Sequence, residues 1–249
     1  MWARIFIFSV FASPLWASVV SLDLGADQWV VWLVPRAQIH SVSYLARNPD
    51  LSCLAAEAQG LSTHSGALED FLDPAIKIII GYEPISIPLK KLCQKRKIHL
   101  IELSYPRSFE ELKKQILLLT GLFHQEPRGK EWISELGAFK KASSRGTATF
   151  YGAHGLGPGN HTLLNDVLNA AGYDNLYSHK KGWTYNSAES LLTTPLSVLF
   201  FLDPPPATSL WTHLKKKIRT TEIPSRLTLC PYPPAVLELI DQLKKGPHA

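Results

Sequence analysis

Aromatic side chains that follow predicted strands are the residues of this 249-residue chain best suited to bind a ligand. Tyr44, Tyr82 and Tyr105 each lie two residues after a short run of apolar, β-branched residues, and Trp183 and Tyr185 share a polar loop. Because the carboxyl ends of parallel strands share one edge of a sheet, we expect these rings to line one cleft. Aromatic walls with a few polar groups suit a flat, bulky ligand. The alternative is that each ring only covers its own part of the fold.

The spacing of the candidate residues supports a metal site or an active site less well than it supports an aromatic cleft. None of the nine histidines belongs to an HxH or HExxH pattern or pairs with a cysteine at ligand spacing. A bare transition-metal ion held by His64, His154 and carboxylates stays open as an alternative. No GxSxG elbow or reactive-cysteine signature is present. We therefore expect a protein that is not an enzyme and has no cofactor; an exported hydrolase of unknown type is the enzymatic alternative.

Three cysteines, Cys53, Cys93 and Cys230, match neither a zinc ribbon nor a CxxC redox motif. We interpret them as small buried apolar side chains, and whether any two of them pair stays open.

The charge distribution argues against a nucleic-acid partner. The chain carries 26 Lys and Arg against 21 Asp and Glu, for a net charge of +5. Its densest basic clusters, residues 95–97 and 215–217, are short and typical of solvated helix ends. An apolar content of 45% with 19% charged residues is globular and excludes a disordered chain.

Short apolar runs alternate with helix-length patterns, which predicts an α/β fold with mainly parallel sheets. The predicted strands are Val19–Leu22, Ile39–Val42, Ile76–Ile80, Ile98–Leu103, Thr147–Tyr151 and Ser197–Leu202. The predicted helices are Ala26–Val34, Pro88–Gln94, Phe109–Phe123, Arg128–Lys141, Leu163–Ala170 and Ala235–Lys244. Ser108 and Glu111 form a capping-box pattern at the start of the third helix.

A weak internal repeat divides this pattern into two halves. Residues 66–80 (GALEDFLDPAIKIII) align without gaps to residues 186–200 (NSAESLLTTPLSVLF), which places Glu69 on Glu189. Each copy predicts a short helix with an exposed glutamate, then a turn and a buried strand. The repeat predicts two lobes, each with a small, mainly parallel sheet flanked by helices. The helical pattern at 127–143 lies between the copies and is predicted to join the lobes.

The first 17 residues are typical of a secretory signal peptide. Arg4 precedes an apolar run at 5–11, and the small residue Ala17 marks the predicted cut. The alternative is an uncleaved anchor, but a membrane-spanning helix of about 20 apolar residues would consume the first strand. We therefore divide the chain into a signal peptide (1–17), an N-terminal lobe (18–126), a connecting helix (127–143) and a C-terminal lobe (144–249). The mature protein is expected to be soluble and periplasmic.

The glycine-rich stretch at 151–159 (YGAHGLGPG) matches neither GxGxxG nor a P-loop. Pro158 also removes a backbone donor that a phosphate cradle would need. We interpret the stretch as a flexible loop, with Asn160 or Thr162 capping the next helix.

Several segments resemble exported binding proteins of cobalamin and iron-siderophore importers. Residues 20–28 (VSLDLGADQ) are similar to the opening SLNLCADQ-type signature of that family. Residues 43–50 (SYLARNPD), 66–80 and 162–176 (TLLNDVLNAAGYDNL) resemble its later elements in the same order, and Cys230-Pro-Tyr-Pro fits before the last helix. Gly25 stands where the family usually has cysteine, which weakens any inherited disulfide to Cys230.

The resemblance implies two α/β lobes bridged by one long helix, and a function in import. Such a protein captures a metal chelate, a ferric siderophore or a corrinoid, and delivers it to the membrane permease of an ABC importer. A haem-binding protein of the same fold is an alternative. In the family one acidic residue per lobe docks to the permease, and Glu69 and Glu189 match those positions. We expect a monomer.

The ligand site expected from this resemblance combines the aromatic residues with nearby polar ones. Its predicted members are Tyr44, Arg47, His64, Tyr82, Tyr105, His154, Trp183 and Tyr185. Arg47 would meet an anionic chelate through charge-assisted hydrogen bonds. No residue is expected to act catalytically or to hold a resident metal.

Overall fold

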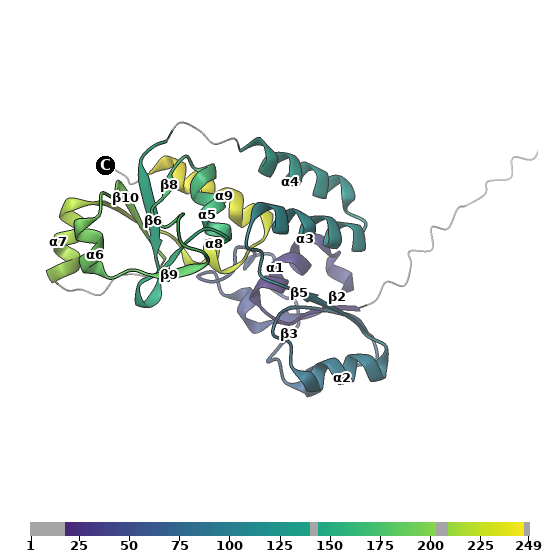
Figure 1. The fold of residues 1–249 in the computed structure, drawn as a ribbon. Helices are drawn as coiled ribbons and strands as arrows, with labels where there is room; N and C mark the ends of the chain where they lie inside the picture. The colour runs from purple at the N-terminus through teal and green to yellow at the C-terminus, as the bar shows by residue number, and fades with distance from the viewer. Residues whose placement is uncertain (1–17, 140–143, 203–208, 247–249) are drawn as a thin grey trace, which may run out of the picture.

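The structure, a computed structural model, describes residues 18–139, 144–202 and 209–246. The predicted signal peptide lies outside the described residues. The chain forms two α/β lobes, each built on one parallel sheet (Figure 1). The predicted fold class is therefore confirmed.

The N-terminal lobe contains five parallel strands in the order β3-β2-β1-β4-β5. Their bounds are β1 (Ser18–Ser21), β2 (Ile39–Ser43), β3 (Thr63–His64), β4 (Ile76–Tyr82) and β5 (His99–Leu103). Its helices are α1 (Leu24–Leu33), α2 (Ile87–Arg96) and α3 (Phe109–Leu122). Successive residues of β1 and β4 face opposite sides of the sheet. Val19 and Ile78 pack in the same core as α1 and α3, whereas Val20 and Ile79 pack with α2. Both faces of the sheet are therefore buried, as parallel sheets require.

The C-terminal lobe repeats this plan with four parallel strands in the order β11-β10-β6-β8. Their bounds are β6 (Thr147–Tyr151), β8 (Asp174–Asn175), β10 (Val198–Phe201) and β11 (Arg219–Glu222). Its helices are α5 (Leu163–Ala170), α6 (Ala188–Thr193), α7 (Ser209–Lys217), α8 (Ser225–Leu229) and α9 (Pro233–Lys245). Phe200 packs with α5 and α9 on one face, and Leu199 packs with α6 and α7 on the other. A separate antiparallel ribbon joins β7 (Leu156–Pro158) to β9 (Trp183–Tyr185).

The two sheets are related as the internal repeat predicts. Without its edge strand β3, the first sheet has the order β2-β1-β4-β5, which corresponds to β8-β6-β10-β11 in the second. Glu69 lies in a short 3-10 helix, Leu68–Phe71, that precedes β4, and Glu189 lies in α6, which precedes β10. Both glutamates are exposed, and both following strands are largely buried. The predicted sequence of short helix, turn and buried strand is found in both copies.

The helix between the lobes is α4, which spans Glu126–Ala138 and packs along α3 (Figure 1). It ends earlier than the predicted connecting helix of 127–143, and residues 140–143 lie outside the described residues. None of the helices in the described ranges is both long and apolar enough to cross a membrane.

Side chains from both lobes meet around Trp32 of α1. Its ring lies 5.6 Å from the Trp132 ring of α4 and 6.0 Å from the Tyr232 ring that precedes α9. The Arg128 guanidinium lies 4.5 Å from the Trp32 ring centre and also donates to the Trp32 carbonyl at 2.8 Å. A second link is the hydrogen bond from the Phe109 backbone N–H to Asp166 Oδ2 at 2.9 Å. The lobes therefore share one continuous apolar core.

The three cysteines are free; Cys93 and Cys230 are buried and Cys53 is half-buried. Cys230 Sγ lies 3.7 Å from the Leu24 carbonyl oxygen, next to Gly25. A Cβ on Gly25 would lie only 2.8 Å from the Tyr82 ring. The Tyr82 ring therefore fills the space that a cysteine side chain at position 25 would need.

Two glycines of α4 give a test of the close approach between α3 and α4. A Cβ on Gly129 would overlap Thr120 of α3, whereas a Cβ on Gly137 would meet no atom within 4 Å. We expect Gly129→Ala to lower the free energy of unfolding by about 1–3 kcal/mol through overpacking. Gly137→Ala should leave it unchanged or raise it by up to about 1 kcal/mol, because alanine favours helix more than glycine. Urea denaturation of both variants measures this, and equal losses would contradict the close approach.

Candidate functional site

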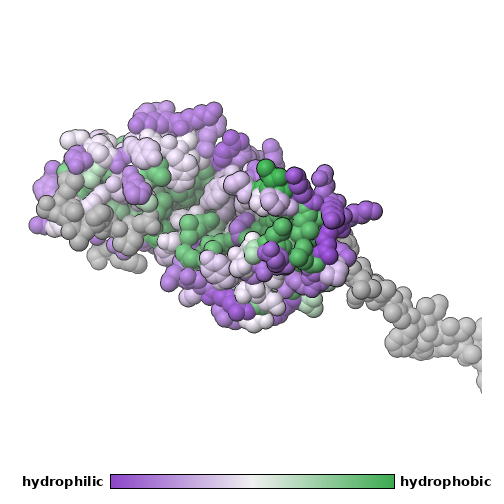
Figure 2. Space-filling model, turned by 90° about the horizontal axis from the view of Figure 1, so that it is seen from below, coloured by the Kyte–Doolittle hydropathy of each residue, from purple (hydrophilic) through white to green (hydrophobic). Residues whose placement is uncertain are grey.

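Two adjoining hollows form a cleft between the lobes. Their volumes are about 450 Å³ and 470 Å³, and they share Tyr105, Leu164 and Trp183. Tyr105 follows β5 of the N-terminal lobe, whereas Trp183 and Leu164 belong to the C-terminal lobe. The cleft therefore lies where the carboxyl edges of the two sheets face each other. Figure 2 shows hydrophobic surface where the lobes meet.

Apolar side chains make up most of the cleft lining. Leucines come from both lobes: Leu51, Leu156, Leu163, Leu164, Leu202 and Leu229. Leu229, at the end of α8, is exposed although it is a large apolar residue. Such a surface can bury a flat apolar face, and its few polar groups would orient the ligand.

The glycine-rich stretch positions Trp183. It is not the flexible loop predicted from the sequence, because its residues 156–158 form β7 and pair with β9. A Cβ on Gly155 or Gly157 would overlap Asn186, so only glycine lets this stretch approach Asn186, the residue after β9, so closely. Pro158 pairs with Trp183 in the register. The ribbon holds the Trp183 ring half-exposed in the cleft. Thr162 caps α5 by accepting from the Asn165 N–H at 3.3 Å, as one of the two predicted caps.

Tyr105 connects the two lobes inside the cleft. Its hydroxyl donates to the Thr228 carbonyl oxygen at 3.0 Å. Its ring lies 6.3 Å from the ring of Tyr82, which forms the layer behind it. The Tyr82 hydroxyl accepts from Trp29 Nε1 at 3.0 Å and donates to Gln115 Oε1 at 3.0 Å. Burial raises the pKa of Tyr82, so its phenol stays neutral and keeps both hydrogen bonds.

Charged and polar groups are few in the cleft. Arg107 lines it, but its guanidinium forms a fork with the Glu111 carboxylate, with Nη2 at 2.8 Å from Oε1. The same carboxylate accepts from the Arg107 backbone N–H at 2.8 Å, while Ser108 Oγ accepts from the Glu111 N–H at 3.2 Å. Ser108 thus caps α3 as predicted. His161 lines the same hollow, and its backbone has a positive φ of 57°.

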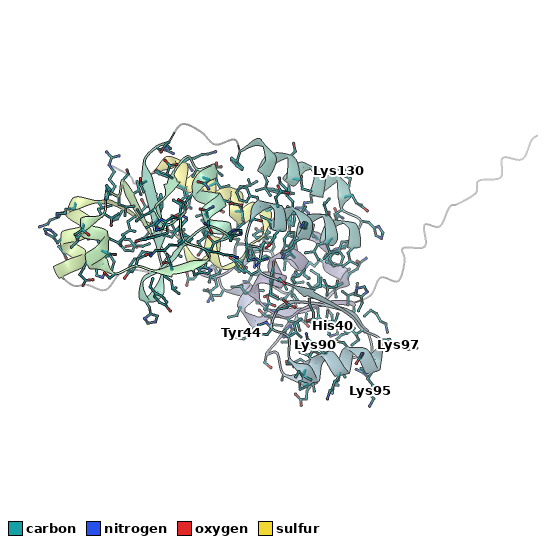
Figure 3. All side chains as sticks on the ribbon, viewed as in Figure 1. His40, Tyr44, Lys90, Lys95, Lys97 and Lys130 are labelled. Carbon is teal, nitrogen blue, oxygen red and sulfur yellow. The ribbon has the colours of Figure 1, made fainter. Side chains whose placement is uncertain are left out.

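Three of the predicted ligand residues are exposed and do not line the two hollows. Tyr44 lies at the edge of the N-terminal lobe that faces the C-terminal lobe (Figure 3). Tyr185 is two residues from Trp183 on β9, so it shares the same side of the ribbon. His154 is exposed and follows the lining residue Ala153.

Arg47 and His64 make their contacts within the N-terminal lobe and do not line the two hollows. The half-buried Arg47 guanidinium donates to the Leu61 carbonyl oxygen, and Gln59 Nε2 donates to the Arg47 carbonyl oxygen at 3.3 Å, so the chain returns to Arg47 at residues 59–61. His64 is buried, with Nε2 at 2.6 Å from the Ser21 carbonyl oxygen and its ring 5.1 Å from the Phe71 ring. In the part of the chain that the structure describes, no three His, Cys, Asp or Glu side chains lie close enough together to hold a metal ion. The pairing of His64 with His154 for a bare metal ion therefore has no support in the described residues.

The sequence prediction missed Arg107, His161 and the leucines of the lining. Arg107 directly follows Tyr105 and Pro106 after a predicted strand, so its place at the sheet edge was available as a signal. His161 immediately precedes the helix cap Thr162. Nothing in the local pattern marked Leu229, because α8 has only five residues.

A buried polar network supports the strand ends beneath the cleft. Asp27 of α1 is fully buried and accepts from Ser21 Oγ at 2.5 Å, from the Ser43 N–H at 2.9 Å and from Ser43 Oγ at 2.5 Å. Burial raises the pKa of Asp27 to about 7, although these hydrogen bonds lower it. Asp27 therefore joins α1 to the ends of β1 and β2 and takes up a proton below neutral pH.

The Asp27 carboxyl predicts that stability falls as pH rises. Its folded pKa lies above its unfolded value, so the folded state binds the extra proton between about pH 4 and 7. Asp27→Asn has no carboxyl to lose this proton. We therefore expect its free energy of unfolding to rise relative to that of wild type by about 1 kcal/mol for each unit of increasing pH across this range. Urea unfolding from pH 4 to 8 measures the difference. The exposed Asp50→Asn serves as control and should run parallel to wild type; a parallel Asp27→Asn curve would contradict the prediction.

No family model matches the sequence, and no curated protein matches it. Solved structures do share its fold. HutB, a periplasmic haem-binding protein of Vibrio cholerae, aligns with a TM-score of 0.74 at 12% identity, over 91% of this chain and 97% of that one. A possible iron-binding periplasmic solute-binding protein from Staphylococcus epidermidis gives 0.72 at 15% identity, over 92% and 98%. BtuF, a periplasmic vitamin B12-binding protein of V. cholerae, gives 0.65 at 14% identity, over 92% and 96%. The two-lobed binding-protein fold that the sequence resemblance implied is thereby confirmed.

Proposed function

We propose that this protein is an exported solute-binding protein that captures a metal chelate between its lobes and delivers it to the permease of an ABC importer. The observation that carries the proposal is the apolar, aromatic-walled cleft at the facing carboxyl edges of the two sheets. Periplasmic binding proteins for haem, iron and vitamin B12 have the same fold. The resemblance of residues 20–28 and 162–176 to such proteins also supports a solute-binding function.

The lining favours a ligand with a broad apolar face. Leucines and the Tyr105 and Trp183 rings dominate it, and the one arginine, Arg107, is already paired with Glu111. A strongly hydrophilic chelate would lose hydrogen bonds to water without finding enough partners here, which costs free energy. Among the expected chelates, a corrinoid or haem therefore fits better than a hydrophilic ferric siderophore.

A hydrolase fits the cleft less well. Within the described cleft, the Thr162 and Thr228 hydroxyls donate to backbone carbonyl oxygens, at 2.7 Å to Gly159 and at 3.2 Å to Ser225. Neither these hydroxyls nor that of Ser225, which also lines the cleft, is hydrogen-bonded to a base within the described residues, as an activated nucleophile would be.

Glu69 and Glu189 are proposed to dock on the permease. Both are exposed, and each occupies the first turn of a short helix before a central strand of its lobe. One negative charge per lobe, in equivalent places, suits a partner with two basic patches. Such rim charges set orientation and association rate more than affinity.

Replacement of Trp183 tests the ligand site. We expect Trp183→Ala to weaken chelate binding about tenfold or more, because it removes an aromatic wall worth about 1–3 kcal/mol, whereas Trp183→Phe should bind within about threefold of wild type. Calorimetric titration with haemin, cyanocobalamin and a ferric hydroxamate measures this. Leu118→Ala, on the exposed side of α3, is the remote control. Unchanged affinity in Trp183→Ala would show that Trp183 does not contact the ligand. If wild type binds none of the three probes, a metal chelate is excluded as the proposed ligand.

Charge reversal tests the docking sites. The double variant Glu69→Lys/Glu189→Lys should abolish chelate uptake by the cognate importer while its chelate affinity stays unchanged, because only the charges facing the permease are inverted. Glu131→Lys/Glu135→Lys, on exposed positions of α4, introduces the same charge change elsewhere and should transport normally. Normal uptake by the first variant would refute the docking role.

A further inference from the structure

A basic hollow lies at the amino edge of the C-terminal sheet, opposite the cleft. Its volume is about 520 Å³, and its walls include Arg145, Arg219 and Lys245. Arg145 lies two residues before β6, Arg219 begins β11 and Lys245 ends α9. In Figure 1 this edge lies at the upper end of the lobe, where α9 ends. The cleft residues Gly152 and Leu202 follow β6 and β10 at the other edge.

Contacts within the fold bring the segment before β6 and the end of α9 together. The Arg145 backbone N–H donates to the Gly172 carbonyl oxygen at 2.8 Å, and its guanidinium lies 5.3 Å from the centre of the Tyr173 ring. The Tyr173 hydroxyl donates to the Leu243 carbonyl oxygen at 3.4 Å, which fixes the end of α9 beside it. A Cβ on Gly246 would lie 4.0 Å from Arg145 Nη2, so the guanidinium reaches the chain just after Lys245.

The charge of the hollow is unbalanced. Its described lining contains no acidic side chain, and no ion pair involves Arg145, Arg219 or Lys245 in the described part of the chain. The carboxyl end of α9 contributes only about half a negative charge. Three full positive charges around one concave surface therefore favour an anion.

We infer that this hollow binds a phosphoryl-type oxyanion. Arginine presents a planar fork of donors that matches phosphate oxygens, and two arginines and a lysine can share the several charges of such a group. Ser197, on the same wall, adds a hydroxyl donor. The hollow is larger than one phosphate ion needs, so a pyrophosphate, a phosphomonoester or the headgroup of an anionic phospholipid fits the same chemistry. The inference does not depend on the chelate cleft.

A matched pair of triple variants tests the site. Arg145→Gln/Arg219→Gln/Lys245→Gln removes the three charges of the hollow. Lys91→Gln/Lys95→Gln/Lys130→Gln removes three charges from exposed positions of α2 and α4, of which Lys95 and Lys130 are labelled in Figure 3. Calorimetric titration with pyrophosphate at low salt should show wild-type binding that the first variant weakens at least tenfold. The control variant should stay within twofold, since a diffuse effect of net charge would weaken both equally.

Two arms distinguish the source of the phosphoryl group. Sedimentation with vesicles of phosphatidylglycerol and phosphatidylcholine reports lipid binding, and pyrophosphate titration reports a free anion. If only the Arg145/Arg219/Lys245 variant loses vesicle binding or pyrophosphate binding, the site is supported. The binding that is lost shows whether the phosphoryl group belongs to a lipid or to a free anion. Equal binding by both variants in both arms, or no binding by wild type in either, overturns the inference. Circular dichroism and an unchanged haemin or cyanocobalamin titration show that the variant is folded and that the cleft is separate.

Discussion

The packing of Trp32 against Tyr232 determines how the two lobes face each other. The two rings meet edge to face at an interplanar angle of 73°, and Trp132 and Arg128 of α4 also contact Trp32. One side chain of the N-terminal lobe thus touches α4, the helix between the lobes, and the segment before α9 of the C-terminal lobe. Because close-packed interiors tolerate little rearrangement, this joint limits how far the lobes can separate. The cleft therefore exists before any ligand enters it, which lowers the ordering cost of binding.

The parallel sheets assign different chemistry to their two edges. At the carboxyl edges, backbone turns bring Tyr105, the β7–β9 ribbon and α8 into an apolar cleft. At the amino edge of the second sheet, the same strands begin beside Arg145 and Arg219. A parallel sheet keeps these edges a full strand length apart, so a charged hollow and an apolar cleft coexist on one small lobe. Their separation would let the proposed ligands of the cleft and of the hollow bind independently of each other.

Local sequence patterns predicted the central strands and the longer helices, but they missed β11, α7 and α8 and did not give the directions of the side chains. β6 and α5 have the bounds expected from periodicity and capping, and the repeat around Glu69 and Glu189 correctly predicted two similar lobes. Arg47 was expected in the cleft, yet it donates to the Leu61 carbonyl, because the chain folds back to it at residues 59–61. That fold-back depends on tertiary contacts, which no local pattern records. The glycine-rich stretch was read as flexible for a related reason, since its partner strand lies some 25 residues away. Steric need for glycine becomes visible only when Asn186 is placed against it.

The balance of charge in the cleft bears on how a ligand would be chosen. Arg107 is the cation of the described lining, and its fork with Glu111 already satisfies much of its hydrogen-bonding capacity. An anionic group on a ligand would have to compete with that carboxylate, so charge alone gives the cleft little affinity. Tyr105 is different, because its ring contacts the hollow while its hydroxyl is committed to Thr228 of the other lobe. A ligand that stacks on the Tyr105 ring would therefore contact the residue whose hydrogen bond joins the two lobes. Shape and apolar area at this joint, more than charge, would decide which chelate the protein holds.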